Sequence, residues 1–243
     1  MNSPEPDRES EKNDQAEHVR TQFLRRIAHD IASPTGVTMT VLDELASADK
    51  PRPELLAMAR RGLRRLMRLS DHLALVAELE TGELQPELDT VDVRALAKQA
   101  LDEALAIDGR KDVVAAADLP AEPLLVAADA RLLLFVIREM IGNALKLATS
   151  RVELSVGSHD GTVTIRIEDD GPGFSADSLA TLGRRFVKRS SARGLGLSIS
   201  IAIEILSGHS GTLAVASSRL PPGRRGTPGA AVVLTLKQLP ANS

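Results

Sequence analysis

The sequence has no cysteine, no tryptophan and no tyrosine, and only four phenylalanines among its 243 residues. The absence of cysteine excludes disulfide bonds, thiolate metal sites and a cysteine nucleophile, and it fits a reducing compartment. Because aromatic side chains are so few, the core has to be built from Leu, Ile, Val and Ala. The apolar fraction of 43% and the chain length suffice for one large domain or two small ones.

Long apolar runs are also lacking, since no window holds 18 uninterrupted apolar residues. The N-terminal segment is polar, so the sequence predicts neither a signal peptide nor a membrane anchor. The net charge of −3 gives no reason to expect a nucleic-acid or anionic-membrane surface. We therefore expect a soluble, cytoplasmic protein with no membrane or nucleic-acid partner, and we interpret residues 1–16 as a disordered lead-in.

Apolar residues at helical spacing over residues 17–82 predict two helices joined by a loop. The first apolar stripe has the alternating steps of a coiled-coil seam, and it consists of Leu24, Ile27, Ile31, Pro34, Thr38, Val41 and Leu45. The second stripe consists of Leu56, Ala59, Leu63, Leu66, Leu73 and Ala77. Two antiparallel helices cannot bury both stripes alone. We therefore expect a homodimer in which two hairpins form a four-helix bundle.

A polar connector at residues 83–92 precedes a region of mixed helical and strand patterns. Helices are expected at 91–106, 130–148 and 195–207, and strands at 113–117, 151–156, 162–168, 213–216 and 231–236. These elements predict a sheet with helices on one face. The fold class is therefore α+β, with a helical hairpin followed by an α/β sandwich domain.

The first polar feature of interest is the pair His29-Asp30, which precedes Pro34 by five residues. An exposed histidine can be phosphorylated, and a neighbouring carboxylate can hold the proton of the other ring nitrogen. Pro34 removes one backbone hydrogen bond and is expected to bend the helix just past the histidine. From these residues alone, a solvated surface histidine beside an unrelated acid is the favoured interpretation.

Three further segments have the chemistry of a nucleotide site. In EMIGNALK, Glu139, Asn143 and Lys146 project to one side of a helix, which suits Mg²⁺ with a polyphosphate. In EDDGPGF, Asp169 can accept a hydrogen bond from an exocyclic amine, while the glycines let the backbone pass close to a ligand. In ARGLGLSI, a glycine pair opens a helix and frees N–H groups for phosphate. A solvated helix face, a strand-ending turn and a plain loop–helix junction are the respective alternatives.

In their order and spacing, these segments resemble the two-component sensor histidine kinases over roughly residues 20–237. AHDIASP is similar to the family's H box, VIREMIGNALK to its N box, IEDDGPGF to its first glycine box and GLGLSI to its second. The resemblance implies a dimerisation and phosphoacceptor hairpin at 17–82, followed at 93–240 by the Bergerat-type ATP-binding domain shared with gyrase, the heat-shock chaperone and MutL.

The resemblance also assigns roles by position. His29 would be the phosphorylated residue, Asp30 the acid that activates it, and Ser33 the third H-box position of interest. The nucleotide-binding set would be Glu139, Asn143, Lys146, Asp169, Gly171, Gly173, Lys188, Gly194, Leu195 and Gly196. Within this set, Asn143 with Glu139 would hold Mg²⁺, Lys146 would touch phosphate and Asp169 would bind the adenine amine. Phe186 and Lys188 resemble a reduced F box.

The sequence departs from the family pattern at four positions. Leu147 replaces an aromatic residue that packs on adenine, and Ala192 replaces the first glycine of the second box. Ser33 stands where Thr or Asn is commoner, and Thr35 stands where the family usually has Leu. We expect weaker nucleotide binding and altered phosphatase activity from these changes.

The resemblance implies an ATP-dependent protein-histidine kinase that uses ATP and Mg²⁺, phosphorylates His29 and passes the phosphoryl group to an aspartate of a response-regulator receiver domain. The alternative is a dimeric histidine phosphotransfer protein or scaffold whose kinase-like domain binds no nucleotide. A separate sensor protein is a candidate source of the input signal. The remaining histidines, His18, His72, His159 and His209, are interpreted as surface or packing residues.

Overall fold

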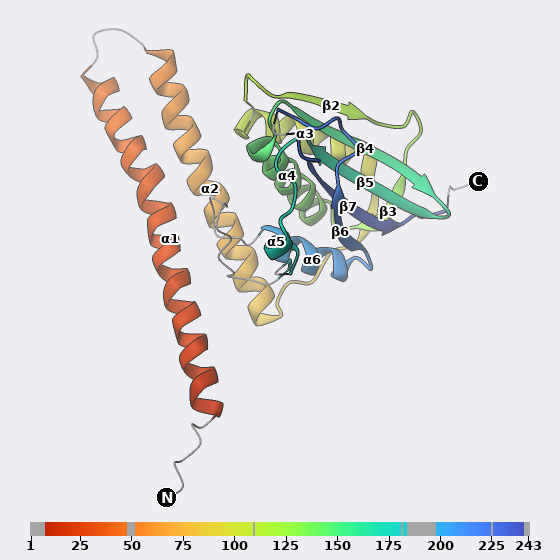
Figure 1. Ribbon diagram of the computed structural model, residues 1–243, viewed down its shortest axis with the longest axis horizontal. Helices are drawn as coiled ribbons and strands as arrows, with labels where there is room; N and C mark the ends of the chain where they lie inside the picture. The colour runs from red at the N-terminus through yellow and green to blue at the C-terminus, as the bar shows by residue number, and fades with distance from the viewer. Residues whose placement is uncertain are drawn as a thin grey trace, which may run out of the picture. The chain divides into compact units, whose positions relative to one another are not determined.

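Two helices, α1 (Arg8–Ala46) and α2 (Pro53–Thr81), run antiparallel and side by side in the N-terminal part of the chain (Figure 1). The structure is a computed structural model that describes residues 8–47, 52–108, 110–180, 182–183, 198–224 and 226–240. Its contacts divide the chain into two units, and the boundary falls within α2, between Ala74 and Leu75.

The hairpin of α1 and α2 packs along part of the expected apolar stripes. Thr38 and Val41 of α1 and Ala59 of α2 are almost fully buried. The helices lie close together at Gly62, where a Cβ atom would overlap the hydroxyl oxygen of Thr38. The other stripe residue of α2 nearby, Leu63, is 49% exposed. The hairpin therefore buries one apolar face internally and leaves a second one open.

The start of α1 differs from our expectation. The helix begins at Arg8, whereas residues 1–16 were interpreted as a disordered lead-in and the helix was expected from His18. The segment RESEKNDQAEHV contains many Glu, Lys, Gln and Ala residues, which are good helix formers. This intrinsic preference lets the helix extend beyond the apolar stripe.

The second unit contains a five-stranded sheet in the order β2-β4-β5-β7-β6. Its strands are β2 (Val114–Asp118), β4 (Arg151–His159), β5 (Thr162–Asp169), β6 (Thr212–Ser217) and β7 (Ala230–Lys237). Strand β2 pairs with β4 in parallel, and the other neighbours are antiparallel. The helices α3 (Val93–Asp108), α4 (Ala130–Leu147) and α6 (Ser198–Gly208) lie on one face of this sheet (Figure 1).

The core of this unit lies between the sheet and the helices. Val163, Ile165 and Ile167 of β5 alternate inward, as the sequence predicts, and each is at most 1% exposed. Apolar residues of α4 and α6 cover them, including Ile137 and Ile201. The α+β fold class, with a helical N-terminal part and an α/β sandwich, is confirmed.

Three short elements were not predicted: β1 (Asp89–Asp92), β3 (Leu125–Ala128) and α5 (Ala176–Ala180). Strands β1 and β3 form a two-stranded antiparallel sheet, so the end of the expected connector and the first residues of the expected 91–106 helix are strand. Each strand has only four residues, which gives too little periodicity to detect. Their pairing depends on residues about 35 positions apart coming together in the folded chain.

Candidate functional site

His29 lies on the outer side of α1, with 79% of its side chain exposed. Its Nδ1 atom is 3.4 Å from Oδ1 of Asp30, whose side chain is only 14% exposed. In that arrangement Nδ1–H donates to the carboxylate, and Nε2 carries the free lone pair. The geometry therefore places an accessible imidazole nitrogen next to a carboxylate that can orient the ring, and Ser33 is exposed one turn further on.

Helix α1 continues through Pro34, which is buried. Thr35 follows the proline, and its hydroxyl donates to the Ile31 carbonyl at 2.7 Å. This side-chain bond satisfies a carbonyl in the turn that the proline ring weakens. The expected bend at Pro34 stays a prediction.

Helix α4 brings Glu139, Asn143 and Lys146 to one side, in order of increasing exposure. Glu139 is 3% exposed, Asn143 is half-buried and Lys146 is exposed. The hydroxyl of Ser198, the first residue of α6, donates to Oε2 of Glu139 at 3.2 Å. The sequence reasoning missed Ser198, although its place directly after GLGL was the available signal.

The oxygen atoms of Glu139 and Asn143 fit a magnesium ion chemically, because Mg²⁺ prefers carboxylate and carbonyl oxygens. No group of three or more His, Cys, Asp or Glu residues that could hold a metal occurs in the described part of the chain. Mg²⁺ is commonly bound by one or two protein side chains and takes its other ligands from water and substrate phosphates.

Asp169 is the last residue of β5 and is almost fully buried, with 4% of the residue exposed. Its Oδ1 accepts hydrogen bonds from the Gly171 N–H at 2.8 Å and the Ala230 N–H at 3.4 Å. Burial raises the pKa of the carboxyl group, the two backbone bonds lower it, and the neighbouring Asp170 charge raises it further. Among the described residues no hydrogen bond reaches Oδ2, so this oxygen is available to a donor such as an exocyclic amine.

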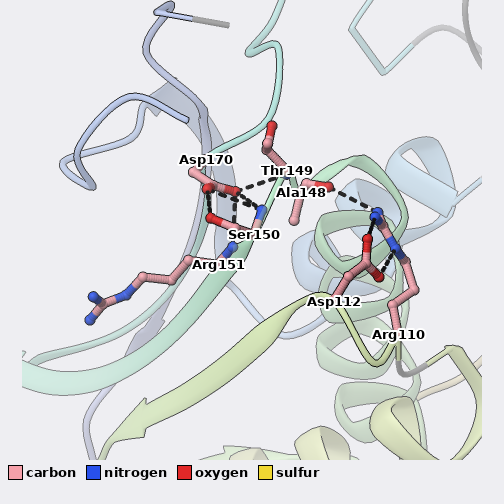
Figure 2. Close-up of polar contacts among 7 residues, drawn as sticks. All are labelled: Arg110, Asp112, Ala148, Thr149, Ser150, Arg151 and Asp170. Atoms are coloured by element: carbon pink, nitrogen blue, oxygen red, sulfur yellow. Dashed lines mark hydrogen bonds and ion pairs between the residues drawn. The ribbon is translucent and has the colours of Figure 1, made fainter. Parts of the chain in front are cut away.

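Asp170 joins the end of β5 to the segment that links α4 to β4 (Figure 2). Its carboxylate accepts bonds from the Ser150 hydroxyl at 2.6 Å and from the N–H groups of Thr149, Ser150 and Arg151 at 2.9–3.1 Å. Burial raises the pKa of Asp170, but these hydrogen bonds outweigh it and lower the pKa to about 2. The sequence reasoning missed this role, for which the paired acids in EDDG were the only signal.

Arg110 holds the same segment from the other side. Its guanidinium donates to the Ala148 carbonyl at 2.9 Å and forms two bonds with the Asp112 carboxylate, as Figure 2 shows. The chain from Ala148 to Arg151 is therefore fixed at both ends by charged side chains. Ala148, whose carbonyl accepts from Arg110, directly follows Leu147, the last residue of α4.

The glycines of the first glycine box allow close backbone contacts. A Cβ atom on Gly171 would overlap the Leu147 carbonyl oxygen, and one on Gly173, where φ is +72°, would approach the Pro228 carbonyl at 2.7 Å. Only glycine fits both requirements at Gly173. The side chain of Leu147, beside this turn, is exposed.

Six residues of interest lie outside the described part of the chain: Phe186, Lys188, Ala192, Gly194, Leu195 and Gly196. The reduced F box and the glycines of the second glycine box are therefore known from the sequence alone. The histidines interpreted as surface or packing residues include an exposed one and a buried one. His159 is exposed, and His209 is buried with Nε2 accepting from the Asp129 N–H at 2.9 Å and Nδ1 donating to the Ile205 carbonyl.

Residues 128–240 match the family model described as histidine kinase-, DNA gyrase B- and HSP90-like ATPase. The chain is 28% identical over 233 residues to the heme sensor protein HssS of Staphylococcus saprophyticus, covering 93% of this chain and 48% of that protein. It is 31% identical over 244 residues to the signal transduction histidine-protein kinase AfsQ2 of Streptomyces coelicolor, covering 93% and 43% respectively.

Solved structures show the same fold. The Acinetobacter baumannii histidine kinase AdeS superposes with a TM-score of 0.59 at 18% identity, over 87% of this chain and 98% of that one. The chain spans about half the length of the curated relatives it matches. In the part of the chain that the structure describes, no helix is both long enough and apolar enough to cross a membrane.

Proposed function

Because the chain belongs to the two-component histidine kinase family, we propose that it moves the γ-phosphoryl group of ATP to His29 and then to an aspartate of a response-regulator receiver domain. The hairpin at 17–82 would serve dimerisation and phosphoryl transfer, and residues 93–240 would bind ATP. The observation that carries this proposal is the exposed His29 imidazole with the Asp30 carboxylate at its Nδ1 atom.

In the first step, the Nε2 lone pair of His29 forms the nitrogen–phosphorus bond while the bond between the γ-phosphorus and the bridging oxygen breaks and ADP leaves. Asp30 accepts the Nδ1–H hydrogen bond and stabilises the positive charge that develops on the ring. In the second step, a carboxylate oxygen of the receiver attacks phosphorus, an acyl phosphate forms and neutral imidazole leaves. Most of the catalysis would come from positioning and charge neutralisation.

For ATP, Asp169 would accept a hydrogen bond from the adenine amine through Oδ2. Glu139 and Asn143 would hold Mg²⁺, which neutralises phosphate charge when bound, and Lys146 would contact phosphate. Lys188, Gly194, Leu195 and Gly196 are assigned to the nucleotide by their motif positions alone. The family match over residues 128–240 does not favour the alternative of a phosphotransfer protein that binds no nucleotide.

The test is incubation of the full chain with γ-labelled ATP and Mg²⁺. We expect label that is stable in base and lost in acid, because a phosphoramidate hydrolyses in acid, and we expect it to move to a receiver domain added afterwards. Calorimetry at about millimolar nucleotide provides the second readout. No heat and no label would refute the kinase proposal.

A further inference from the structure

His209 is a buried histidine that the proposed reaction does not use. It directly follows α6, and only 6% of the residue is exposed. The Asp129 N–H donates to its Nε2 at 2.9 Å, and its Nδ1 lies 2.6 Å from the Ile205 carbonyl oxygen. A backbone N–H can only donate and a carbonyl can only accept, so the ring has to be neutral with its proton on Nδ1. An imidazolium, which has two donors, would lose the bond to Asp129.

The two backbone groups that this ring joins belong to the ends of two different helices. Asp129 is the N-cap residue of α4, and its carboxylate accepts from the Leu132 N–H at 3.1 Å. The Ile205 carbonyl belongs to the last turn of α6, where carbonyl groups have no N–H partner within the helix. His209 therefore connects the C-terminal end of α6 to the N-terminal end of α4.

The other end of α6 is also bonded to α4. The hydroxyl of Ser198, the first residue of α6, donates to Glu139 at 3.2 Å. At about 1.5 Å per residue, the two bonding positions are about 16 Å apart along α6 and about 15 Å apart along α4. The helices are therefore antiparallel, and the two contacts match in their spacing along both of them.

These two hydrogen bonds add a register to the apolar packing of α6. The side of α6 that faces the core consists of Ile201, Ala202, Ile205 and Leu206, each at most 1% exposed. Apolar burial stabilises the helix but is non-directional, whereas a hydrogen bond weakens steeply when its geometry is disturbed. The bonds at the two ends together therefore define where α6 lies along α4.

We propose that His209 is a positioning residue of the nucleotide site, an inference that rests on the proposed function. By anchoring the C-terminal end of α6, the neutral ring fixes the register of the helix and keeps Ser198 at Glu139, the proposed magnesium ligand. Gly194 and Gly196, which are assigned to the phosphates, come shortly before Ser198 in the sequence. A displacement of about 1 Å near a reacting group can slow a reaction about a hundredfold. His209 thus acts through α6 on the phosphate end of the site.

The test uses two substitutions that each keep half of the bridge. In His209→Gln the amide oxygen can reach the position of Nε2 and accept from Asp129, whereas in His209→Asn the amide nitrogen takes the position of Nδ1 and donates to Ile205. His159→Asn is the matched control, because His159 is an exposed histidine at the end of β4. Calorimetry of the full chain with ATP and Mg²⁺ gives both the dissociation constant and the fraction of the protein that binds.

We expect His209→Gln to bind ATP within about threefold of the parent, and His209→Asn to bind at least about tenfold more weakly with an unchanged binding fraction. A residue that only stabilises the fold would lower the binding fraction and leave the dissociation constant of the folded protein unchanged. Labelling of His29 should slow in His209→Asn, and His159→Asn should match the parent. Equal affinities in His209→Asn and the parent would overturn the inference while the proposed function stands. Equal losses in the two His209 variants would overturn it as well.

A double-mutant cycle tests the register directly. Contacts about 16 Å apart that share no partner usually contribute independently, so the fold losses of Ser198→Ala and His209→Asn would then multiply. If both contacts fix one register, the second substitution removes little that the first has left. We therefore expect the double variant to bind ATP within about twofold of the weaker single variant.

Multiplied losses in this cycle would overturn the inference. So would a His209→Asn variant that circular dichroism shows to be unfolded at the assay temperature, because the ring would then be required for the fold itself. Absence of ATP binding and of label in the parent would instead refute the proposed function, and this inference with it.

Discussion

The hairpin and the ATP-binding unit differ in which polar and apolar side chains they bury and which they leave exposed. In the ATP-binding unit, the carboxylates of Glu139, Asp169 and Asp170 are buried and bonded to neighbouring chain segments. In the hairpin, His29 is open to solvent with one polar contact, and apolar side chains such as Leu63 are half exposed. The ATP-binding unit buries its apolar core between the sheet and the helices, whereas the hairpin leaves several large apolar side chains exposed.

The largest expected effect tests the exposed histidine. The chain contains a second His–Asp pair, His159 at the end of β4 and Asp160 directly after it, which is highly exposed with Nε2 3.1 Å from the carboxylate. We expect His29→Gln to lose all acid-labile label from ATP and His159→Gln to keep it. Electrophoresis after labelling measures this, and label retained in His29→Gln would contradict the assignment of the phosphoacceptor.

The second prediction tests the open apolar face of the hairpin. In a dimer formed through this face, Leu63→Glu would place two unpaired charges in the interface, so we expect dimer affinity to fall by at least about a hundredfold. Val114→Glu adds the same charge at an exposed position on β2 and should leave the dimer unchanged. Sedimentation at micromolar concentration measures both. A parent protein that is monomeric there would exclude the four-helix bundle.

The third prediction tests the buried carboxylate of the ATP-binding unit. Asp169→Asn removes a charged acceptor from a desolvated position, which typically costs about 1.5–3 kcal/mol. We therefore expect ATP to bind one to two orders of magnitude more weakly by calorimetry, with an unchanged circular dichroism spectrum. Asp118→Asn, at an exposed strand end, is the matched control. Equal affinities in the two variants would mean that Asp169 does not contact the nucleotide.

The fourth prediction concerns stability against pH. The pKa of Asp170 is about 2 in the folded protein, below the ordinary aspartate value of about 3.9. A depressed pKa gives stability that is fully present above about pH 4 and is lost as pH falls through about 2, amounting to roughly 2–3 kcal/mol. We expect urea unfolding, followed by circular dichroism, to show Asp170→Asn less stable at neutral pH by about that amount. The difference from the parent should vanish toward pH 2, and a constant difference would argue against this linkage.

The smallest effect distinguishes two hairpin glycines. Gly62→Ala would force a Cβ atom against Thr38, and overpacking of this kind costs about 1–3 kcal/mol. Gly36→Ala has no heavy atom within 4 Å of the new Cβ atom and should stabilise α1 by roughly 0.5–1 kcal/mol. Hydrogen exchange of hairpin amides in the full chain measures both. Equal changes would show that the close approach at Gly62 is unimportant.

Much of the site could be predicted because its residues form short local patterns. The spacing of Glu139, Asn143 and Lys146 places them on one side of a helix whatever that helix packs against. The alternation in β5 likewise predicts which residues face the core. The roles of Ser198 and Asp170 could not be predicted in this way. Their hydrogen bonds join positions 59 and about 20 residues away, which only the folded chain brings together.

The sequence by itself determined the order of the helices and main strands, the polar sides of α1 and α4, and the exposed position of His29. These properties follow from side-chain periodicity, because a helix or strand repeats its facing every few residues. Only the tertiary structure decided that Asp170 fixes the chain between α4 and β4, and that the hairpin buries part of each apolar stripe while leaving residues such as Ile31 and Leu63 exposed. Those outcomes depend on which groups distant in the sequence come into contact in the folded chain. Local periodicity carries no information about such contacts.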